Sequence, residues 1–531
     1  MLPKPTACQG CPAYGNGKGF VPDELVAGSP VWLLGCGVTR DEELTGQPLA
    51  GRAGAWVERD FFPLAGLTRH QNVSIGNLLK CRWTDTNTGK KTDALPIPTV
   101  LRDTIAHCTA AHLRIPAGVN LIVAHGEEAW AYASNGVGPL LGKGEDDESG
   151  KWRGYLAPEP RLGIPSLGVL GVHEVLKKRR YLVPSQWDWQ KIRSILKGTW
   201  PLPVPPCPTE QDWASAESWL THAQTAEYVV IDTEFDRDTK SLFLMGLGAK
   251  HGEAFTGLQF QWIHGIAKRT AFTAALRNII RRVPIVFHNA MADLPVIEQA
   301  TGIAYREYRQ VEDTMLAQAV LYSEWPHDLE FCDSLCGKHT KLKHLSDTNA
   351  LLYNWGDVLS TQYVHEWNLR EFQRDPASER IYREQSLRLY APRLEALADG
   401  IAVNQPRVQE LLTLYGARKI AAQRIAQAYV GYPINVGSDK QLKYWLYQRG
   451  ALAVQKNKQT KQASIGKDAI AVLRRQFYDF DPDDEKDGLT PEQVQRNIAQ
   501  GAHPLLEARA LYAGASQMMS HYLHPLLDGG G

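Results

Sequence analysis

The sequence has few cysteines, no net charge and no long apolar segment. Eight cysteines among 531 residues are too sparse for a disulfide scaffold, which leaves metal binding or burial as their roles. The 58 basic residues balance 58 acidic ones, so any contact with nucleic acid must come from local basic patches. No apolar run approaches the roughly 20 residues of a membrane span, and the N-terminus lacks the apolar core of a signal peptide. We therefore expect a cytoplasmic protein that makes no membrane contact.

The length and composition predict a multidomain α/β protein. A chain of 531 residues with 44% apolar composition can bury several cores. A proline-rich linker at residues 199–209 separates an α/β domain at 1–198 from a second α/β domain at 210–396. Residues 397–531 are expected to be mainly helical.

Periodicity within these regions predicts individual elements. In the first region, short apolar runs alternate with helix-like segments, which is typical of a parallel sheet; the runs are Val31–Leu34, Val73–Ile75 and Asn120–Ala124. In the last region, the pattern predicts long amphipathic helices at Pro406–Tyr429 and His503–Leu527.

Acidic residues beside apolar runs give the strongest chemical signal. Asp232 and Glu234 end the apolar run Tyr228–Ile231, and alternation along this predicted strand places both carboxylates on one face. Asp293 and Asp357 follow later in the chain. Mg²⁺ and Mn²⁺ prefer oxygen ligands, and two such ions can activate water and stabilise the leaving oxygen of a phosphodiester. The pattern predicts a two-metal nuclease.

Two neighbouring residues extend this site or its scaffold. Tyr353 precedes Asp357 by four residues, so a helix would place the phenol and the carboxylate on one face, where the phenol could orient the attacking water. Asp313 could act in catalysis or as the N-cap of a helix beginning at Thr314. We leave Asp313 out of the predicted metal site.

The order of these motifs resembles the DEDDy 3′-5′ exonucleases, the proofreading domain of family A DNA polymerases. The motifs are Asp-x-Glu at 232–234, His288-Asn289-Ala290-x-x-Asp293, Glu312-Asp313-Thr314 and Tyr353-x-x-x-Asp357. Ala292 departs from the family, which usually has an aromatic residue there. The resemblance implies an RNase H-like fold, release of nucleoside monophosphates and a DNA contact by Asn289. RNA stays open as a substrate, because the same acids serve RNA-processing nucleases.

Four cysteines in the first region form a second candidate site. Cys8-x-x-Cys11 lies near the start, and Cys81 and Cys108 follow as single cysteines. Four thiolates can hold one metal centre, and their softness favours zinc or an iron-sulfur cluster. The spacing alone does not choose between the two.

The same region resembles the iron-sulfur uracil-DNA glycosylases, family 4 and its relatives. The matching elements are Cys8-x-x-Cys11-Pro12, the run Thr45–Gly54, the run Asn77–Arg82, and Cys108. The resemblance implies that the four cysteines bind a [4Fe-4S] cluster. It also implies that Asn77 and His173 line a base pocket.

The glycosylase chemistry itself is not expected. The acidic residue of the family's Gly-Glu-x-Pro-Gly motif is replaced here by Cys36, and a thiol with a pKa of about 8.5 is a poor substitute for a carboxylate. His173 is kept without the proline that follows it in the family. The alternative is that Asp41 or Glu42 retains the activity.

The last region resembles the thumb of family A polymerases. Leu397–Asn404 is similar to the element that joins exonuclease and polymerase parts, and Ile434–Leu442 and His503–Leu506 are similar to thumb segments. Lysines in a turn-like tip are expected to neutralise duplex phosphates without reading sequence. These lysines are Lys456, Lys458 and Lys461.

No palm or fingers sequence follows, so we expect no polymerase activity from this chain alone. Either another polypeptide carries that part, or the chain is a piece of a longer protein. A zinc site at Cys332, Cys336, His339 and His344 is disfavoured, because buried cysteines on a helix explain the spacing as well.

The leading hypothesis is a DNA 3′-5′ exonuclease that proofreads for a family A polymerase and meets a single-stranded 3′ end and a primer-template duplex. One alternative is a DNA-binding accessory subunit of a split polymerase, completed by a separate palm-fingers polypeptide. The other is a repair protein with an active uracil-DNA glycosylase domain.

Overall fold

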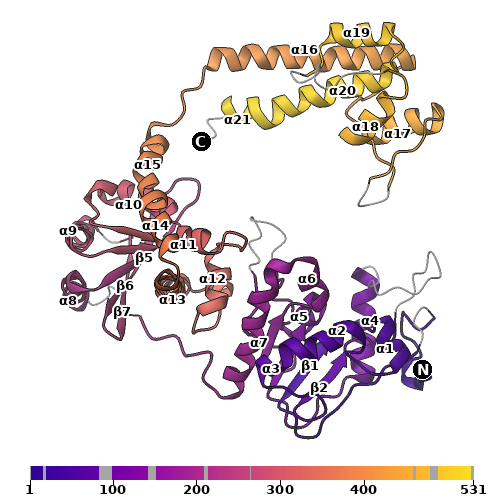
Figure 1. Cartoon of the computed structure of the whole chain (residues 1–531). Helices are drawn as coiled ribbons and strands as arrows, with labels where there is room; N and C mark the ends of the chain where they lie inside the picture. The colour runs from indigo at the N-terminus through magenta and orange to yellow at the C-terminus, as the bar shows by residue number, and fades with distance from the viewer. Residues whose placement is uncertain are drawn as a thin grey trace. The chain divides into compact units, whose positions relative to one another are not determined.

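The computed structural model describes residues 2–15, 19–82, 98–141, 151–207, 213–263, 265–457, 462–478 and 488–527. The chain divides into two compact units, Met1–Leu394 and Glu395–Gly531. The first unit contains two β-sheets and the second is helical (Figure 1). Among the described helices, none is long and apolar enough to span a membrane.

The first sheet is parallel and has four strands. In the order β2-β1-β3-β4, the strands are β1 (Val31–Gly35), β2 (Val73–Asn77), β3 (Leu121–His125) and β4 (Ser166–Val169). Nearly all of their residues are buried, as expected for a parallel sheet that is covered on both faces. The strands predicted in this region are confirmed.

Helices cover both faces of this sheet. On one face, Phe62 of α3 (Phe62–Ala65) and Trp189 of α7 (Leu182–Leu196) pack against alternate strand residues. On the other face, Trp130 of α5 (Glu127–Ala133) does the same. The remaining helices are α1 (Arg40–Thr45), α2 (Gly51–Trp56), α4 (Pro98–His112) and α6 (Val172–Lys177). The result is a three-layer α/β domain.

The second sheet is mixed and has five strands in the order β7-β6-β5-β8-β9. Its strands are β5 (Tyr228–Phe235), β6 (Leu242–His251), β7 (Ala254–Gln261), β8 (Ile285–Phe287) and β9 (Val311–Asp313). β6 runs antiparallel to β5 and β7, whereas β8 and β9 run parallel to β5. This arrangement is RNase H-like, as the sequence predicted.

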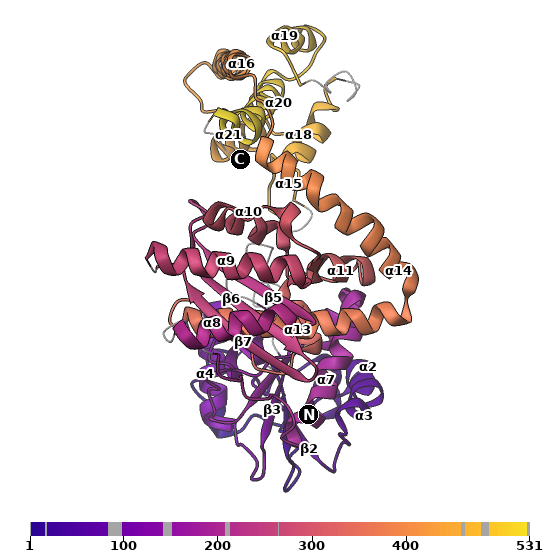
Figure 2. The same cartoon turned by 90° about the vertical axis from the view of Figure 1, so that its left-hand side faces the viewer.

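Two helical layers enclose the second sheet. The layer formed by α8 (Trp213–His222), α9 (Ile266–Arg282) and α10 (Ala290–Thr301) packs on the face that carries Val229 and Ile231. α8 and α9 lie in front of the sheet in Figure 2. The long helix α13 (Ala350–Arg374) covers the opposite face, with Trp355 and Val358 on Tyr228 and Val230. Nearby helices are α11 (Thr314–Leu321), α12 (Leu329–Cys336) and α14 (Pro376–Ile381).

The proline-rich linker lies on the second α/β domain over its described length. The Trp200 indole donates to the Gly337 carbonyl (3.1 Å), and the Leu202 N–H donates to the Lys338 carbonyl (2.7 Å). The Pro205 carbonyl accepts a hydrogen bond from the Trp355 indole at 2.8 Å. The linker is therefore a packed connection and not a free spacer.

The second unit is helical, as predicted. Its long helix α16 (Gln405–Val430) packs along α20 (Pro504–Gln517), and the shared core includes Ala426 and Leu505. The others are α17 (Asp439–Lys443), α18 (Lys467–Arg474), α19 (Pro491–Ala499) and α21 (His524–Leu527), and α15 (Tyr390–Asp399) spans the boundary between the units.

Candidate nuclease site

Strand alternation and one helix bring the predicted acids together. Tyr228 and Val230 point to the face of β5 that α13 covers, so Asp232 and Glu234 point to that face as well. α13 packs there through its apolar residues and thereby presents Asp357 to the strand. The sequence places two acids on the strand, and the fold supplies the third from a helix more than 100 residues later.

The three acids form a compact oxygen cluster. One carboxylate oxygen from each of Asp232, Glu234 and Asp357 lies within 4.8 Å of the other two. Oxygens on opposite sides of one divalent ion, each about 2.0–2.4 Å from it, are up to about 4.8 Å apart. All three residues are half-buried. The geometry and the hard oxygen donors fit a Mg²⁺ or Mn²⁺ ion.

The electrostatics of the cluster also favour a cation. Burial raises the pKa of Glu234 and of Asp357 to about 7 each. Burial, together with the charges of Asp357, Asp293 and Glu234, raises the pKa of Asp232 well above its usual value. Each carboxylate is therefore costly to ionise beside the others. A bound divalent cation offsets this repulsion.

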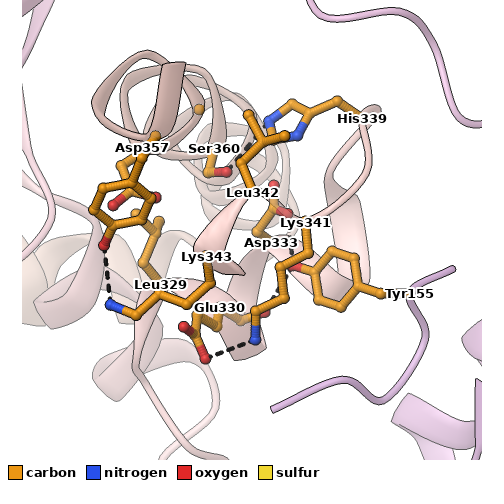
Figure 3. A pocket seen from close by; sticks show the side chains of 12 residues that line it. Tyr155, Leu329, Glu330, Asp333, His339, Lys341, Leu342, Lys343, Asp357 and Ser360 are labelled. Atoms are coloured by element: carbon orange, nitrogen blue, oxygen red, sulfur yellow. Dashed lines mark hydrogen bonds and ion pairs between the residues drawn. The ribbon is translucent and has the colours of Figure 1, made fainter. Parts of the chain in front are cut away.

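Three polar residues that the sequence analysis missed support the cluster and Asp293. The Asn354 amide donates to Asp232 Oδ2 at 2.7 Å. The Lys343 ammonium, labelled in Figure 3, donates to the Tyr353 hydroxyl at 3.1 Å. The Thr233 hydroxyl donates to the Asp293 carboxylate at 2.5 Å. Asn354 and Thr233 stand directly beside motif residues, which is a signal that could have found them. Lys343 stands ten residues before Tyr353, outside any motif quoted above.

Asp293 lies beside the cluster but is not one of the three residues whose oxygens meet within 4.8 Å. It occupies the first turn of α10, and its partner Thr233 points to the opposite face of β5 from Asp232 and Glu234. Burial raises the pKa of Asp293 to about 7, and its charge in turn raises the pKa of Glu234. Asp293 is close enough to couple to the cluster electrostatically.

Asp313 is a structural cap. Its carboxylate accepts hydrogen bonds from the N–H groups of Met315 and Leu316 at the start of α11. It also accepts from the N–H groups of Asn289 and Ala290 at the start of α10, and from the Tyr390 hydroxyl. The side chain is fully buried. Of the two roles left open by the sequence, the helix cap is the one that the contacts support.

Asn289, the predicted DNA contact, is half-buried in a left-handed conformation (φ 66°).

The four N-terminal cysteines line one cavity. Cys8 Sγ lies 3.1 Å from His112 Nε2. Burial raises the pKa of Cys108 to about 12, and Cys81 and Cys11 add to the rise through their charges. The structure therefore places Cys8, Cys11, Cys81 and Cys108 around one cavity, although they are not among the described residues whose ligand atoms all lie within 4.8 Å of one another.

The cysteine and histidine set in the second domain does not form a metal site within the described residues. Cys336 Sγ donates to the Cys332 carbonyl one turn earlier in α12. His339 Nδ1 lies 2.7 Å from the Thr340 carbonyl and its Nε2 lies 3.3 Å from the Ser360 hydroxyl. Burial and local hydrogen bonding account for the positions of these residues.

Glu42, one of the two acids that could have retained glycosylase activity, has both carboxylate oxygens occupied by hydrogen bonds. Glu42 is 5% exposed and accepts four hydrogen bonds. Its donors are the N–H and hydroxyl of Thr39, the N–H of Leu49 and the side-chain amide of Asn77. Burial raises the pKa of Cys36 far above that of an ordinary thiol, and His173 is exposed. Glu42 has no oxygen left over to serve as a general base.

The predicted duplex-binding lysines are only partly described. Lys456 is exposed and forms an isolated antiparallel β-bridge with Ala463. Lys458 and Lys461 lie outside the described residues.

Comparisons with known proteins agree with the site. Residues 209–364 match the DNA polymerase A exonuclease family model, which is described as 3′-5′ exonuclease. The chain is 24% identical over 301 residues to DNA polymerase I of Pseudomonas aeruginosa, a match that covers 51% of this chain and 32% of that protein. The match thus spans about a third of the relative's length.

A solved structure is also similar. It is the POL domain of Pol1 from M. smegmatis in complex with DNA primer-template and dNTP, with a TM-score of 0.42 and 17% identity over 59% of this chain and 48% of that one. On the family match and the curated relative, the chain contains a 3′-5′ exonuclease domain homologous to that of family A DNA polymerases.

Proposed function

We propose that this chain is a metal-dependent 3′-5′ exodeoxyribonuclease that proofreads for a family A polymerase. The observation that carries the proposal is the oxygen cluster of Asp232, Glu234 and Asp357 inside the segment that matches the exonuclease model. Asp293 lies outside this cluster but close enough to raise the pKa of Glu234, and we expect it to supply a further ligand to a second ion. Divalent ions held by these residues would lower the pKa of a water and would stabilise charge on the phosphodiester.

Side chains beside the acids position the reacting groups. Asn354 fixes the orientation of Asp232 through its 2.7 Å hydrogen bond. Tyr353 lies one helical turn before Asp357 and receives a hydrogen bond from Lys343 at 3.1 Å, so its phenol is held in place to orient the attacking water. The water adds its oxygen to the terminal phosphorus, the bond from phosphorus to the 3′ oxygen breaks, and that oxygen takes up a proton. The products are a nucleoside 5′-monophosphate and a DNA strand with a new 3′ hydroxyl.

Digestion of a 5′-labelled primer-template with Mg²⁺ tests this function. The wild-type chain should give a ladder that shrinks from the 3′ end, and Asp232→Ala/Glu234→Ala should give none. Asp238→Ala is the matched control, since Asp238 is an exposed carboxylate just past the same strand. Cleavage that persists in the double variant, or that survives chelation of the metal, would refute the assignment.

A second function follows from the cysteine cavity. We infer that Cys8, Cys11, Cys81 and Cys108 hold a [4Fe-4S] cluster in a glycosylase-like domain that binds DNA without cleaving the glycosidic bond. Support comes from the four thiols around one cavity and from the absence of a free acid at Glu42. Elevated thiol pKa values at Cys81 and Cys108 disfavour thiolates in the absence of a metal, which a cluster would reverse.

Anaerobic purification tests the cluster. The chain should be brown and contain about four iron and four sulfide ions per molecule, and Cys81→Ser should lose both colour and iron. Cys207→Ser is the control, because Cys207 lies outside the cavity. Release of free uracil from single-stranded DNA is expected to be absent, and its presence would favour the repair-enzyme alternative.

The helical second unit is proposed to hold duplex DNA through Lys456, Lys458 and Lys461. Such phosphate contacts weaken as salt rises. The accessory-subunit alternative predicts that a separate palm-fingers polypeptide forms a stable complex with this chain and that the complex synthesises DNA with higher processivity than that polypeptide alone.

A further inference from the structure

Buried hydrogen bonds connect the first α/β domain to α12, the helix that precedes α13 and its nuclease residues. The Tyr155 hydroxyl donates to the Asp333 carboxylate of α12 at 2.6 Å. Arg153, whose side chain is 2% exposed, is paired with Asp188 and also donates to the Ser334 hydroxyl. The contact is polar, buried and continuous, so α12 is fixed to the first domain.

Lys341, which follows α12, is anchored to the same domain. Its ammonium donates to the Lys151 carbonyl at 2.8 Å and to the Glu330 carboxylate at 3.0 Å. It also lies over the Trp152 ring, 4.8 Å from the centroid. The side chain is 3% exposed, and burial lowers its pKa. A buried lysine is tolerated because these partners satisfy it.

Lys343, two residues later, turns to the nuclease site. Its ammonium reaches the Tyr353 hydroxyl at 3.1 Å and lies 5.0 Å from the ring centroid. One cavity is lined by Tyr155, Lys341, Lys343, Tyr353 and Asp357, so a residue of the first domain forms part of the wall beside the nuclease residues (Figure 3).

We propose that the first domain is a positioning element of the exonuclease, because its grip on Lys341 and α12 holds Lys343 against Tyr353. Lys341 and Tyr155 are positioning residues: they act on the reaction through Lys343. This inference rests on the proposed exonuclease function and extends it to a domain that the family match over residues 209–364 does not cover.

The physical reason is side-chain order. A lysine side chain loses much rotamer freedom when it is fixed, so Lys343 keeps its hydrogen bond to Tyr353 only if its backbone is held. Two contacts hold the backbone that leads to Lys343. Lys341 is bonded to the first domain, and His339 Nε2 lies 3.3 Å from the Ser360 hydroxyl of α13. A small displacement of a group that orients a nucleophile lowers the rate strongly.

A double-mutant cycle on the full chain tests the proposal. Lys341→Met removes the ammonium and keeps the apolar stem. We expect it to lower kcat for Mn²⁺-dependent release of the 3′-terminal nucleotide about tenfold, with KM for DNA nearly unchanged. Lys343→Met should lower kcat about 10²-fold. The double variant should be no slower than Lys343→Met, because Lys341 acts through Lys343. Equal losses in both backgrounds would overturn the proposal.

Lys338→Met is the matched control. Lys338 stands on the same segment, is exposed, and places its ammonium over the Tyr363 ring at 5.3 Å and not on the first domain. Its substitution should leave kcat unchanged. If Lys341→Met does not fold, Tyr155→Phe, which removes only one hydroxyl, takes its place in the same cycle with the same expected non-additivity.

Amide hydrogen exchange separates this proposal from the exonuclease assignment. Residues 338–345 should exchange faster in Lys341→Met and Tyr155→Phe and at the wild-type rate in Lys338→Met. If the wild type degrades no DNA but the exchange pattern holds, the exonuclease function fails and the anchoring stands. If the wild type degrades DNA and exchange is unchanged in both anchor variants, the positioning role is refuted and the function stands.

Discussion

Two kinds of acidic residue lie in the two α/β domains, and they differ in what surrounds the carboxylate. Glu42 in the first domain accepts four hydrogen bonds, from Thr39, Leu49 and Asn77. Asp232 in the second domain has a donor in Asn354 but faces the carboxylates of Glu234 and Asp357. An acid supplied with donors is part of the scaffold, whereas acids that face one another are short of positive charge and fit a cation.

Asp313 extends the comparison within the nuclease domain itself. It stands in a family motif, and yet four backbone N–H groups and the Tyr390 hydroxyl satisfy it. The distinction between scaffold and site therefore follows the local supply of donors and not the domain or the motif.

The largest effect is expected from Asp357→Asn. Loss of one cluster carboxylate should lower the rate of nucleotide release about 10³-fold, because charge stabilisation at the reacting phosphate depends on the bound ions. Single-turnover cleavage of labelled DNA measures it. A variant within tenfold of wild type would show that the cluster is not the catalytic centre.

Asp313→Ala should act on stability. Removing its carboxylate leaves buried N–H groups without acceptors at the starts of α10 and α11, which costs about 3 kcal/mol of unfolding free energy. The midpoint of urea unfolding measures this, with Asp347→Ala, an exposed acid in the same domain, as the control. An unchanged midpoint would contradict the capping role.

Each α/β domain contains a histidine whose protonation in acid opposes folding, and in the nuclease domain the site carboxylates with raised pKa values act in the opposite direction. Burial lowers the pKa of His125 and of His365 to about 4. The unfolded chain, with histidine pKa values of about 6.5, therefore holds more protons on these residues than the folded chain between pH 6.5 and 4. The contribution of each histidine to stability should be full above about pH 6.5 and decline as the pH falls toward 4, by up to about 3 kcal/mol. Urea midpoints of wild type and His365→Gln at pH 7.5, 5.5 and 4.5 isolate this contribution, and the midpoint of wild type should fall relative to that of the variant as the pH falls.

Glu42→Gln should destabilise the first domain by about 2 kcal/mol, because one oxygen that accepts buried N–H donors becomes an NH₂ group. Exonuclease activity should be unchanged. Tryptophan fluorescence during urea unfolding and the cleavage assay together report both results. A more stable variant would show that the hydrogen bonds accepted by Glu42 do not stabilise the first domain.

The smallest expected effect is an increase in stability. In the absence of metal, Asp357→Asn should raise the unfolding free energy by about 1 kcal/mol, because it relieves repulsion with Glu234. The urea midpoint in chelator, compared with wild type, measures it. Destabilisation of the same size as in Asp313→Ala would erase the contrast between the two kinds of acid.

Much of this could be read from the sequence because it depends on local periodicity. Alternation along Tyr228–Ile231 was enough to place Asp232 and Glu234 on one face, and apolar runs located the strands of the first sheet. The ordered motifs pointed to the exonuclease segment that the family model also matches.

The rest could not be predicted, because it arises from contacts between segments far apart in the chain. Nothing in the sequence around Asp313 distinguishes a cap from a catalyst, since its donors come from two helices that meet only in the fold. Likewise, Lys341 finds its acceptor in Lys151, 190 residues earlier. The position of Asp293 beside Thr233, outside the cluster of three, also depends on the packing of α10.

Anomalous diffraction from crystals grown with Mn²⁺ tests the central claim most directly. The account predicts a manganese peak bonded to oxygens of Asp232, Glu234 and Asp357 at about 2.2 Å, and its loss in crystals of Asp357→Asn. Manganese that binds elsewhere while these three carboxylates stay free of metal would contradict the assignment of this cluster as the metal centre of the nuclease.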